Sequence, residues 1–235
     1  MRKLLQLMAA NPRRTGLRVE ASAPGEATVY VYDAIGPWGV EASTFVQEVA
    51  KITAGTIHLR INSPGGDVFD ARAMKTALDG HSSKVIAHID GLSASAASFL
   101  MLAADEIEIA DGAFVMIHEP WGLAIGNATE MRETADLLDR VNDAIVNDYR
   151  ARTGRTEAEL RAWMQSETWF DAAQAVENGF ADRIGGKPSA KSAFNLAAYR
   201  NAPQALAAPA PDTFDALAGD RQRYEARLAL YERAS

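Results

Sequence analysis

Three short stretches of the chain carry side chains that could break an acyl bond. The first, residues 90–100, contains Ser93, Ser95 and Ser98 among small apolar residues. A strand pattern runs into it and a helical pattern follows it, and a helix start presents unpaired N–H groups to a developing negative charge. Ser95, in the first turn of the predicted helix, is the best-placed nucleophile, whereas Ser93 fits an ordinary helix cap and Ser98 lies a turn further on.

The other two stretches are His118, after a predicted strand, and the Pro-Gly-Gly turn at 64–66. A neutral imidazole is the natural base for a serine hydroxyl, and glycines let backbone approach a substrate carbonyl. Taken singly, each stretch has an ordinary structural interpretation as close packing, a structural histidine or a turn. Because all three follow predicted strands, and such strand ends meet at one edge of a parallel sheet, we expect them to form one site for acyl transfer.

The elements that would position these residues follow from the periodicity of apolar side chains. Strand and helix patterns alternate, which implies right-handed βαβ crossovers and a largely parallel sheet, and therefore an α/β fold. The predicted strands are 27–33, 56–61, 84–89, 106–109 and 113–117. The predicted helices are 41–52, 68–78, 99–104, a long one that Asn127 opens with a capping box and Gly154 closes, and two that begin at Thr156 and Asp171.

A change in composition divides the chain. We expect an N-terminal segment over 1–26, one compact domain over 27–184, an Ala/Pro-rich flexible linker over 185–212 and a C-terminal helix over 213–235. The first ten residues briefly imitate a signal peptide, but their apolar run is too short, so we predict no export.

The composition excludes several classes of function. A net charge of −7 gives no electrostatic reason to expect a nucleic-acid partner, and no stretch approaches the length of a membrane span. The absence of cysteine excludes disulfides and thiolate chemistry and is compatible with a reducing cytoplasm. Metal-ligand spacings and phosphate-binding glycine loops are also missing, so we expect neither a metal nor a cofactor.

Four motifs together resemble the proteolytic subunit of the Clp protease. They are Ile-Asn-Ser-Pro-Gly-Gly at 61–66, Asp-Gly-Leu-Ser-Ala-Ser-Ala-Ala at 90–97, Met-Ile-His-Glu-Pro at 116–120 and Ala-Val-Glu-Asn-Gly-Phe-Ala-Asp at 175–182. They occur in the family's order over roughly 27–184. Finer likenesses at 32–36, 66–70, 126–128 and 167–170 point to the phage and prophage branch, the head maturation proteases. The resemblance implies a fold like that of the Clp protease and the crotonases, with stacked parallel sheets and a protruding handle helix over about 129–152.

The resemblance also implies roles for individual residues. Ser95 corresponds to the nucleophile, His118 to the general base, and the N–H groups of Gly66 and Ala96 to the oxyanion hole. The family's triad aspartate falls at Glu167, where the sequence departs from the family.

A glutamate can orient a histidine, but its extra methylene requires a different backbone placement. Asp171 therefore stays open as the alternative to Glu167 for the triad acid.

The implied function is a serine endopeptidase that forms a homo-oligomeric ring, or stacked rings, and cleaves a polypeptide such as a capsid or scaffold protein. The expected location is the cytoplasm or the inside of a phage prohead. One alternative is the proteolytic subunit of an ATP-dependent Clp protease, fed by an ATPase unfoldase. Another, which Glu167 favours, is a ring-forming scaffold with vestigial activity, and a third is a crotonase-like enzyme acting on acyl-coenzyme A thioesters.

Overall fold

The computed structural model describes residues 17–37, 39–186, 194, 196, 198–203 and 206. The chain divides into two units, Arg13–Ser192 and a second that combines Met1–Pro12 with Ala193–Ser235. The first unit carries every helix and strand named below. The predicted C-terminal helix at 213–235 lies outside the described residues, as does most of the predicted linker, so both stay predictions.

The few described residues of the second unit include two tight turns. The N–H of Tyr199 donates to the carbonyl of Leu196 at 2.9 Å, and that of Leu206 donates to the carbonyl of Pro203 at 2.9 Å.

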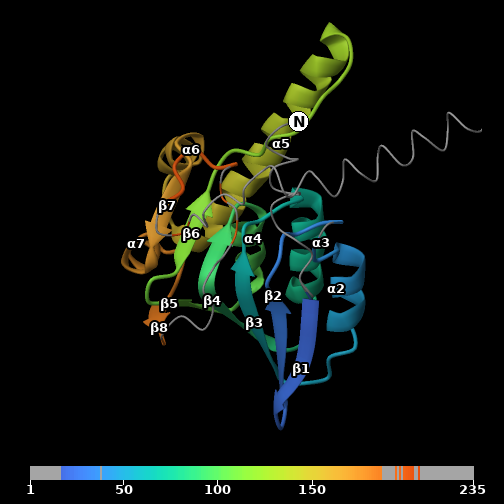
Figure 1. Cartoon of the computed structure of the whole chain (residues 1–235), viewed down its shortest axis with the longest axis vertical. Helices are drawn as coiled ribbons and strands as arrows, with labels where there is room; N and C mark the ends of the chain where they lie inside the picture. The colour runs from blue at the N-terminus through green and yellow to red at the C-terminus, as the bar shows by residue number, and fades with distance from the viewer. Residues whose placement is uncertain are drawn as a thin grey trace, which may run out of the picture. The chain divides into compact units, whose positions relative to one another are not determined.

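An eight-stranded sheet forms the centre of the first unit (Figure 1). Its order is β1-β2-β3-β4-β5-β8, and β6 branches from β4 and carries β7. The β1–β2 and β6–β7 pairs are antiparallel and the other pairs are parallel. The strands are β1 (Leu17–Ala23), β2 (Glu26–Val31), β3 (Thr56–Ser63), β4 (Lys84–Ala94), β5 (Glu106–Ala110), β6 (Phe114–Ile117), β7 (Thr168–Asp171) and β8 (Arg183–Gly185). The predicted α/β class and the largely parallel sheet are confirmed.

Three helices begin directly after the predicted capping residues Asn127, Thr156 and Asp171, whereas the helix predicted over 99–104 begins earlier, at Ala96. The helices are α2 (Ala42–Val49), α3 (Val68–Asp79), α4 (Ala96–Leu100), the 3-10 turn η1 (Met101–Ala103), α5 (Ala128–Thr153), α6 (Glu157–Gln165) and α7 (Ala172–Glu177). Asn127 and Glu130 form the predicted capping box of α5, and Gly154 ends that helix in the left-handed conformation. Capping boxes also open α6 at Thr156 and α7 at Asp171.

Strand β4 is longer than predicted, and this difference positions the site. The prediction ended the strand at Ile89 because the glycine and small residues that follow resemble a turn. The strand instead continues to Ala94: its first part pairs with β5, and its last residues, from Leu92, pair with β6. Small side chains allow this change of neighbour because the strand can turn from one partner to the other without a steric clash. As a result, β4 leads directly to Ser95.

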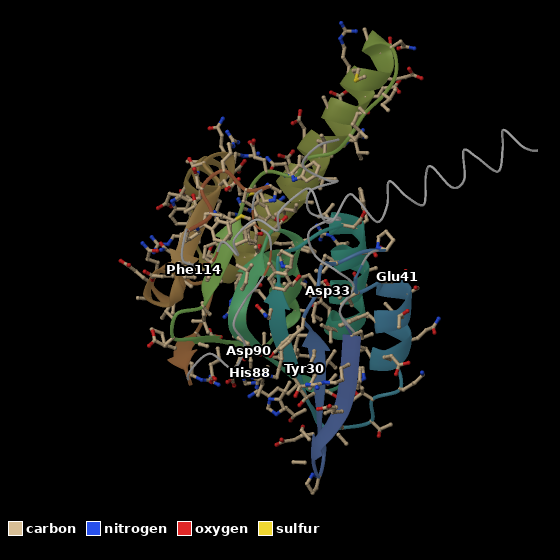
Figure 2. The ribbon with its side chains drawn as sticks, in the orientation of Figure 1. Tyr30, Asp33, Glu41, His88, Asp90 and Phe114 are labelled. Atoms are coloured by element: carbon tan, nitrogen blue, oxygen red, sulfur yellow. The ribbon has the colours of Figure 1, made fainter. Side chains whose placement is uncertain are left out.

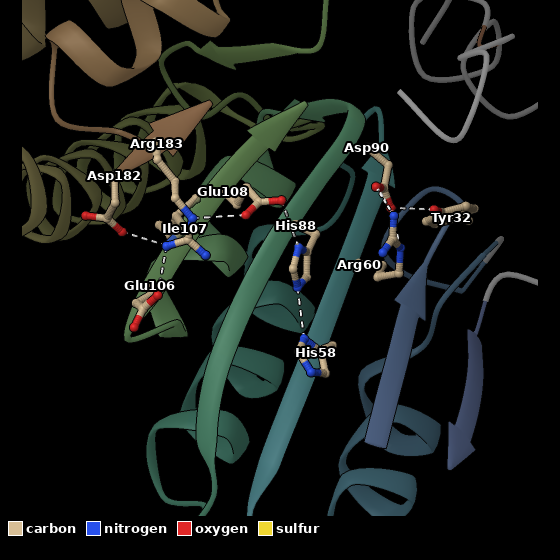
Figure 3. A network of polar contacts seen from close by, with 10 residues as sticks. All are labelled: Tyr32, His58, Arg60, His88, Asp90, Glu106, Ile107, Glu108, Asp182 and Arg183. Atoms are coloured by element: carbon tan, nitrogen blue, oxygen red, sulfur yellow. Dashed lines mark hydrogen bonds and ion pairs between the residues drawn. The ribbon is translucent and has the colours of Figure 1, made fainter. Parts of the chain in front are cut away.

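The two faces of the sheet differ in character. Alternate residues of the central strands, such as Val29, Leu59 and Ile107, are fully buried and pack on the side that helices α2 and α3 cover (Figure 1). The opposite face of β2 to β5 and β8 carries a network of polar side chains (Figure 3). Within it, the Arg60 guanidinium pairs with the Asp90 carboxylate, with Nε at 2.9 Å from Oδ2. Period-two alternation in each strand therefore separates an apolar core face from a charged face.

The labelled side chains in Figure 2 include residues of this charged face from two strands of the sheet, β2 and β4. His88 and Asp90 come from β4, and Tyr30 comes from β2, with Glu41 on the far side near the start of α2. His88 also bonds His58 of β3, with Nε2 at 3.0 Å from the Nδ1 of His58.

Three strands were not predicted. β1 falls in the segment expected to precede the compact domain, yet it pairs with β2 along its whole length. β7 and β8 are only four and three residues long. Strands this short, or with an exposed polar edge such as that of β1, give too few apolar alternations to stand out.

The N-terminal half of helix α5 projects away from the sheet (Figure 1). The buried residues of α5, Ile145, Val146 and Tyr149, all lie in its C-terminal half. The loop before it and its N-terminal half expose large apolar side chains, which we call the handle surface: Trp121, Leu123, Ile125, Met131 and Leu137.

Candidate active site

Three strand ends meet at the site. The end of β4 pairs with β6 in parallel, with Ala94 opposite Met116. β6 pairs with β7 in antiparallel register, with Ile117 opposite Thr168. The carboxyl ends of β4 and β6 and the amino end of β7 therefore lie at one edge. Ser95 directly follows β4, His118 directly follows β6, and Glu167 directly precedes β7.

Ser95 and His118 are in direct contact. Ser95 Oγ lies 2.7 Å from His118 Nε2, which is hydrogen-bond distance. The N–H of Ser95 also donates to the carbonyl of Met116 at 2.9 Å, which fixes the serine backbone to β6. Both side chains belong to partly exposed residues, so solvent or a substrate can reach them.

The other two serines lie elsewhere. Ser93 is fully buried within β4, and its hydroxyl contacts Met101 Sδ at 3.5 Å. Ser98 is fully buried in α4 and bonds to backbone and to Tyr149. The hydroxyls of Ser93 and Ser98 are thus enclosed, whereas that of Ser95 lies at hydrogen-bond distance from His118.

Backbone strain marks two of these positions. Among the residues that the structure describes, Ser95 and Glu167 are the non-glycine residues with positive φ, at 54° and 52°. A side chain rarely adopts this conformation, and strained residues persist where the surrounding structure holds them, often at functional sites. The strain at Ser95 belongs to the sharp turn from β4 into α4, which carries the hydroxyl at its tip.

Glu167 directly precedes β7, the strand that pairs with β6. If the β6–β7 register continues by one residue, Glu167 stands opposite His118. The carbonyl of Met164 supports this arrangement, because it accepts the N–H of Glu167 at 3.1 Å and that of Glu119 at 3.2 Å. Glu167 is 7% exposed, and its Oε1 is 3.4 Å from the indole N–H of Trp169.

Asp171 occupies a different place. It pairs with Phe114, at the opposite end of β6 from His118. Its carboxylate accepts the N–H of Gln174 at 2.8 Å and so caps α7. Asp171 is exposed, and its carboxylate already serves a structural role at the start of α7.

The Pro-Gly-Gly turn approaches Ser95 through its first glycine. A Cβ on Gly65 would lie 2.6 Å from Ser95 Cβ and 2.9 Å from the nitrogen of Ala96. The turn is shaped by Ser63, whose Oγ accepts the N–H of Gly65 at 3.2 Å. Only a glycine permits this approach, because φ at Gly65 is also +89°.

Gly66 points its N–H outward. Ile35 donates to the carbonyl of Gly65 and accepts the N–H of Asp67, each at 2.9 Å. In a parallel pair this pattern leaves the N–H of the intervening residue, Gly66, facing the opposite edge. Ala96 begins α4, so its N–H has no partner within the helix. Neither N–H is therefore used in these backbone pairings, neither that of Gly66 with Ile35 nor that of Ala96 within α4.

Sequence reasoning missed the separate role of Gly65. The sequence assigned a donor role to Gly66 and gave Gly65 no role beyond the turn, whereas Gly65 packs on the serine turn and Gly66 on Ile35, where a Cβ would lie 2.0 Å from the carbonyl oxygen. No local signal separates the two glycines, because the contacts come from distant segments. Strand β7 did have a signal, since Thr168-Trp-Phe is a β-branched and aromatic run.

Clusters of three or more metal-binding side chains do not occur among the described residues. Nor, in that part of the chain, does any helix have the length and apolar character that crossing a bilayer requires.

An α/β fold that presents a serine hydroxyl to a histidine nitrogen, next to backbone N–H groups, is of the class that serine hydrolases use. The family model described as Clp protease matches residues 44–188. The chain therefore belongs to the Clp protease family.

Curated relatives agree with this family. The chain is 28% identical over 130 residues to the ATP-dependent Clp protease proteolytic subunit 1 of Leifsonia xyli, an alignment that covers 54% of this chain and 66% of the relative. It is 28% identical to the ATP-dependent Clp protease proteolytic subunit of Chlorella vulgaris, over 54% of this chain and 65% of the relative. It is 26% identical to subunit 1 of Protochlamydia amoebophila, over 75% of this chain and 88% of the relative. The chain thus spans just under two thirds of the length of the first two relatives.

Proposed function

We propose that this protein is a serine endopeptidase in which Ser95 is the nucleophile and His118 the general base. The distance of 2.7 Å between Ser95 Oγ and His118 Nε2 is the observation that carries the proposal. Membership of the Clp protease family supports the same class of reaction.

The reaction begins when Ser95 Oγ attacks the peptide carbonyl and its proton moves to His118 Nε2. The N–H groups of Gly66 and Ala96 stabilise the oxyanion that forms, and such a donor typically contributes about a hundredfold to a thousandfold in rate. His118 then returns the proton to the leaving amine, and water hydrolyses the acyl-enzyme.

Glu167 acts on the far side of the imidazole. For Nε2 to accept the serine proton, Nδ1 must carry the other ring hydrogen, and a carboxylate on that side favours this tautomer. The register of β6 and β7, the strained backbone and the burial of Glu167 support this role.

A polypeptide substrate binds in extended form beside residues 65–67, adding to the exposed edge that begins at Gly66. Phe69, a large apolar side chain two residues after this segment, is 60% exposed and offers contact area for the substrate.

The finer proposal is processing of a capsid or scaffold protein during phage head maturation, as a ring of identical subunits. The motifs at 32–36, 66–70, 126–128 and 167–170 support the phage branch. The handle surface supports self-association, because exposed apolar area of this kind is typical of an interface.

A second candidate is the degradative subunit of a machine with an ATPase unfoldase, which the names of the relatives favour. The two candidates differ in whether folded substrate is cut without ATP. Cleavage of a native scaffold protein by the purified chain alone favours the first, and a requirement for an added ATPase and ATP favours the second.

The test of the core proposal is Ser95→Ala, assayed on a fluorescein-labelled unfolded protein. We expect a loss of at least about a thousandfold in rate, because the nucleophile and base act as a unit. Ser93→Ala is the matched control, since Ser93 is a buried serine two residues earlier that does not reach His118. Equal cleavage by Ser95→Ala and wild type would exclude the proposal.

A further inference from the structure

A second serine and a tyrosine lie directly beneath the nucleophile. Ser98 Oγ donates to the carbonyl of Ser95 at 2.6 Å, and the Ser98 N–H donates to the same oxygen at 3.0 Å. Ser98 Oγ also lies 2.7 Å from the hydroxyl of Tyr149, in the packed half of α5. Two groups of Ser98 therefore bond to the carbonyl oxygen of Ser95, and Tyr149 bonds to one of them.

The direction of these hydrogen bonds can be assigned. A carbonyl oxygen only accepts, so the single hydrogen of Ser98 Oγ is used in the bond to Ser95. The Tyr149 hydroxyl must then donate to Ser98 Oγ. Tyr149 is 2% exposed, and burial raises the pKa of its phenol, so it keeps the proton that it donates. The chain of donation runs from Tyr149 to Ser98 to the carbonyl of Ser95.

The carbonyl of Ser95 and the N–H of Ala96 belong to the same peptide unit. This unit is planar and trans, so the two groups point in opposite directions. Holding the carbonyl down on Ser98 consequently aims the N–H of Ala96 away from α4, to the side of the proposed oxyanion hole. Hydrogen bonds accepted by a carbonyl also polarise its peptide and strengthen the donor at the other end.

The Ser95 peptide needs such support because its backbone is strained, with φ at 54° and ψ at −124°. A strained peptide relaxes unless neighbouring contacts hold it. The two bonds from Ser98 hold the carbonyl oxygen of Ser95, and Gly65 leaves no room on the other segment for the serine turn to relax toward it, because even a Cβ there would lie 2.9 Å from the nitrogen of Ala96.

We infer that Ser98 and Tyr149 are positioning residues that orient and polarise the Ala96 N–H for oxyanion stabilisation. This inference rests on the proposed function, because it assigns a role within the same reaction. Neither residue touches the substrate, and both act through the Ser95–Ala96 peptide.

The test compares Ser98→Ala, Tyr149→Phe and the double variant with wild type, in steady-state proteolysis and in the rate of fluorophosphonate labelling. We expect Ser98→Ala to lower kcat by about tenfold to a hundredfold with KM within about twofold, because the donor acts on the transition state. Tyr149→Phe should lower kcat by about threefold to tenfold. The double variant should match Ser98→Ala alone, because Tyr149 acts only through Ser98.

Ser93→Ala is again the matched control, because Ser93 is a fully buried serine in the same segment and its hydroxyl contacts the Met101 sulfur at 3.5 Å. It should keep kcat within about twofold of wild type. If Ser98→Ala does not fold, as judged by circular dichroism, Tyr149→Phe decides the question by itself.

An unchanged kcat in Tyr149→Phe would overturn the inference, and so would additive losses in the double variant. Failure of the proposed function gives a different result, in which wild type itself neither cleaves nor takes the label.

Discussion

Gly65→Ala tests the contact between the Pro-Gly-Gly turn and the serine turn. The new Cβ would lie 2.5 Å from the carbonyl oxygen of Ala94, 2.6 Å from Ser95 Cβ and 2.9 Å from the nitrogen of Ala96. Ordinary van der Waals contact at such a Cβ begins at 3.4 Å. The serine turn or the glycine turn must therefore move by roughly half an ångström to one ångström, and two of the three obstructing atoms are backbone.

A shift of this size affects rate more than stability. A misplacement of about 1 Å at a reacting centre can cost about a hundredfold in rate, which corresponds to about 2.7 kcal/mol in the activation barrier. The left-handed φ adds about 1–2 kcal/mol of backbone strain to the folded state. We therefore expect kcat/KM to fall by about a hundredfold or more while the protein still folds.

Gly25→Ala separates the steric displacement of the serine turn from the strain of a left-handed φ. Gly25 has nearly the same φ, +80°, but a Cβ there would meet no atom within 4 Å. It should reproduce the strain of about 1–2 kcal/mol in urea unfolding and leave kcat/KM within about twofold of wild type. Proteolysis of a labelled unfolded protein gives the rate. Wild-type activity in Gly65→Ala, or an equal loss in Gly25→Ala, would refute the reasoning.

Three further predictions concern the acid, the charged face and the handle surface. Glu167→Gln should lower kcat by about a hundredfold to ten-thousandfold because it removes the charge that orients the imidazole, whereas Asp171→Asn should leave kcat near wild type, in the same proteolysis assay. Burial, with a smaller contribution from Arg60, lowers the pKa of His88 below 6.5, so the unfolded chain binds this proton more readily than the folded chain. The free energy of unfolding should therefore fall as the pH drops below 6.5, which urea unfolding at about pH 7.5 and 5.5 would show. His88→Gln should flatten this pH dependence. Ile125→Asp, at a side chain 82% exposed, should shift sedimentation to smaller species if the handle surface joins copies of the chain.

The groups facing His88 determine the sign of that pH effect. Glu108 and Asp90 raise its pKa, whereas His58 and Arg60 lower it, and burial is the largest cause (Figure 3). Protonation of His88 would place a second positive charge beside Arg60 and disturb the hydrogen bond to His58, whose ring nitrogen is 3.0 Å away. The contribution of neutral His88 to the free energy of unfolding is thus fully present above pH 6.5 and is lost as the pH falls below that value.

Local chemistry in the sequence was enough to predict much of the fold. Asn127, Thr156 and Asp171 each open a helix with a capping box, and their side chains accept the N–H groups that the spacing indicated. The strand-to-helix joint at Ser95 could also be predicted, because small residues follow an apolar strand there.

The remaining features depend on contacts between distant segments. Ser98 and Tyr149 are 51 positions apart, so no local pattern links them. Whether Glu167 or Asp171 approaches the histidine depends on the register of β7, a strand of four residues. The positive φ of Glu167 likewise follows from how Met164 and β7 hold the chain, and periodicity carries no information about it.

The central claim is that His118 activates the hydroxyl of Ser95. A fluorophosphonate probe followed by peptide mapping tests it most directly, because only an activated serine reacts rapidly with the probe. We predict a single label on Ser95 in wild type and a labelling rate at least about a hundredfold lower in His118→Ala. Absence of the label in the folded protein, a label on another residue, or unchanged labelling of His118→Ala would contradict the claim and leave the chain a family member without this activity.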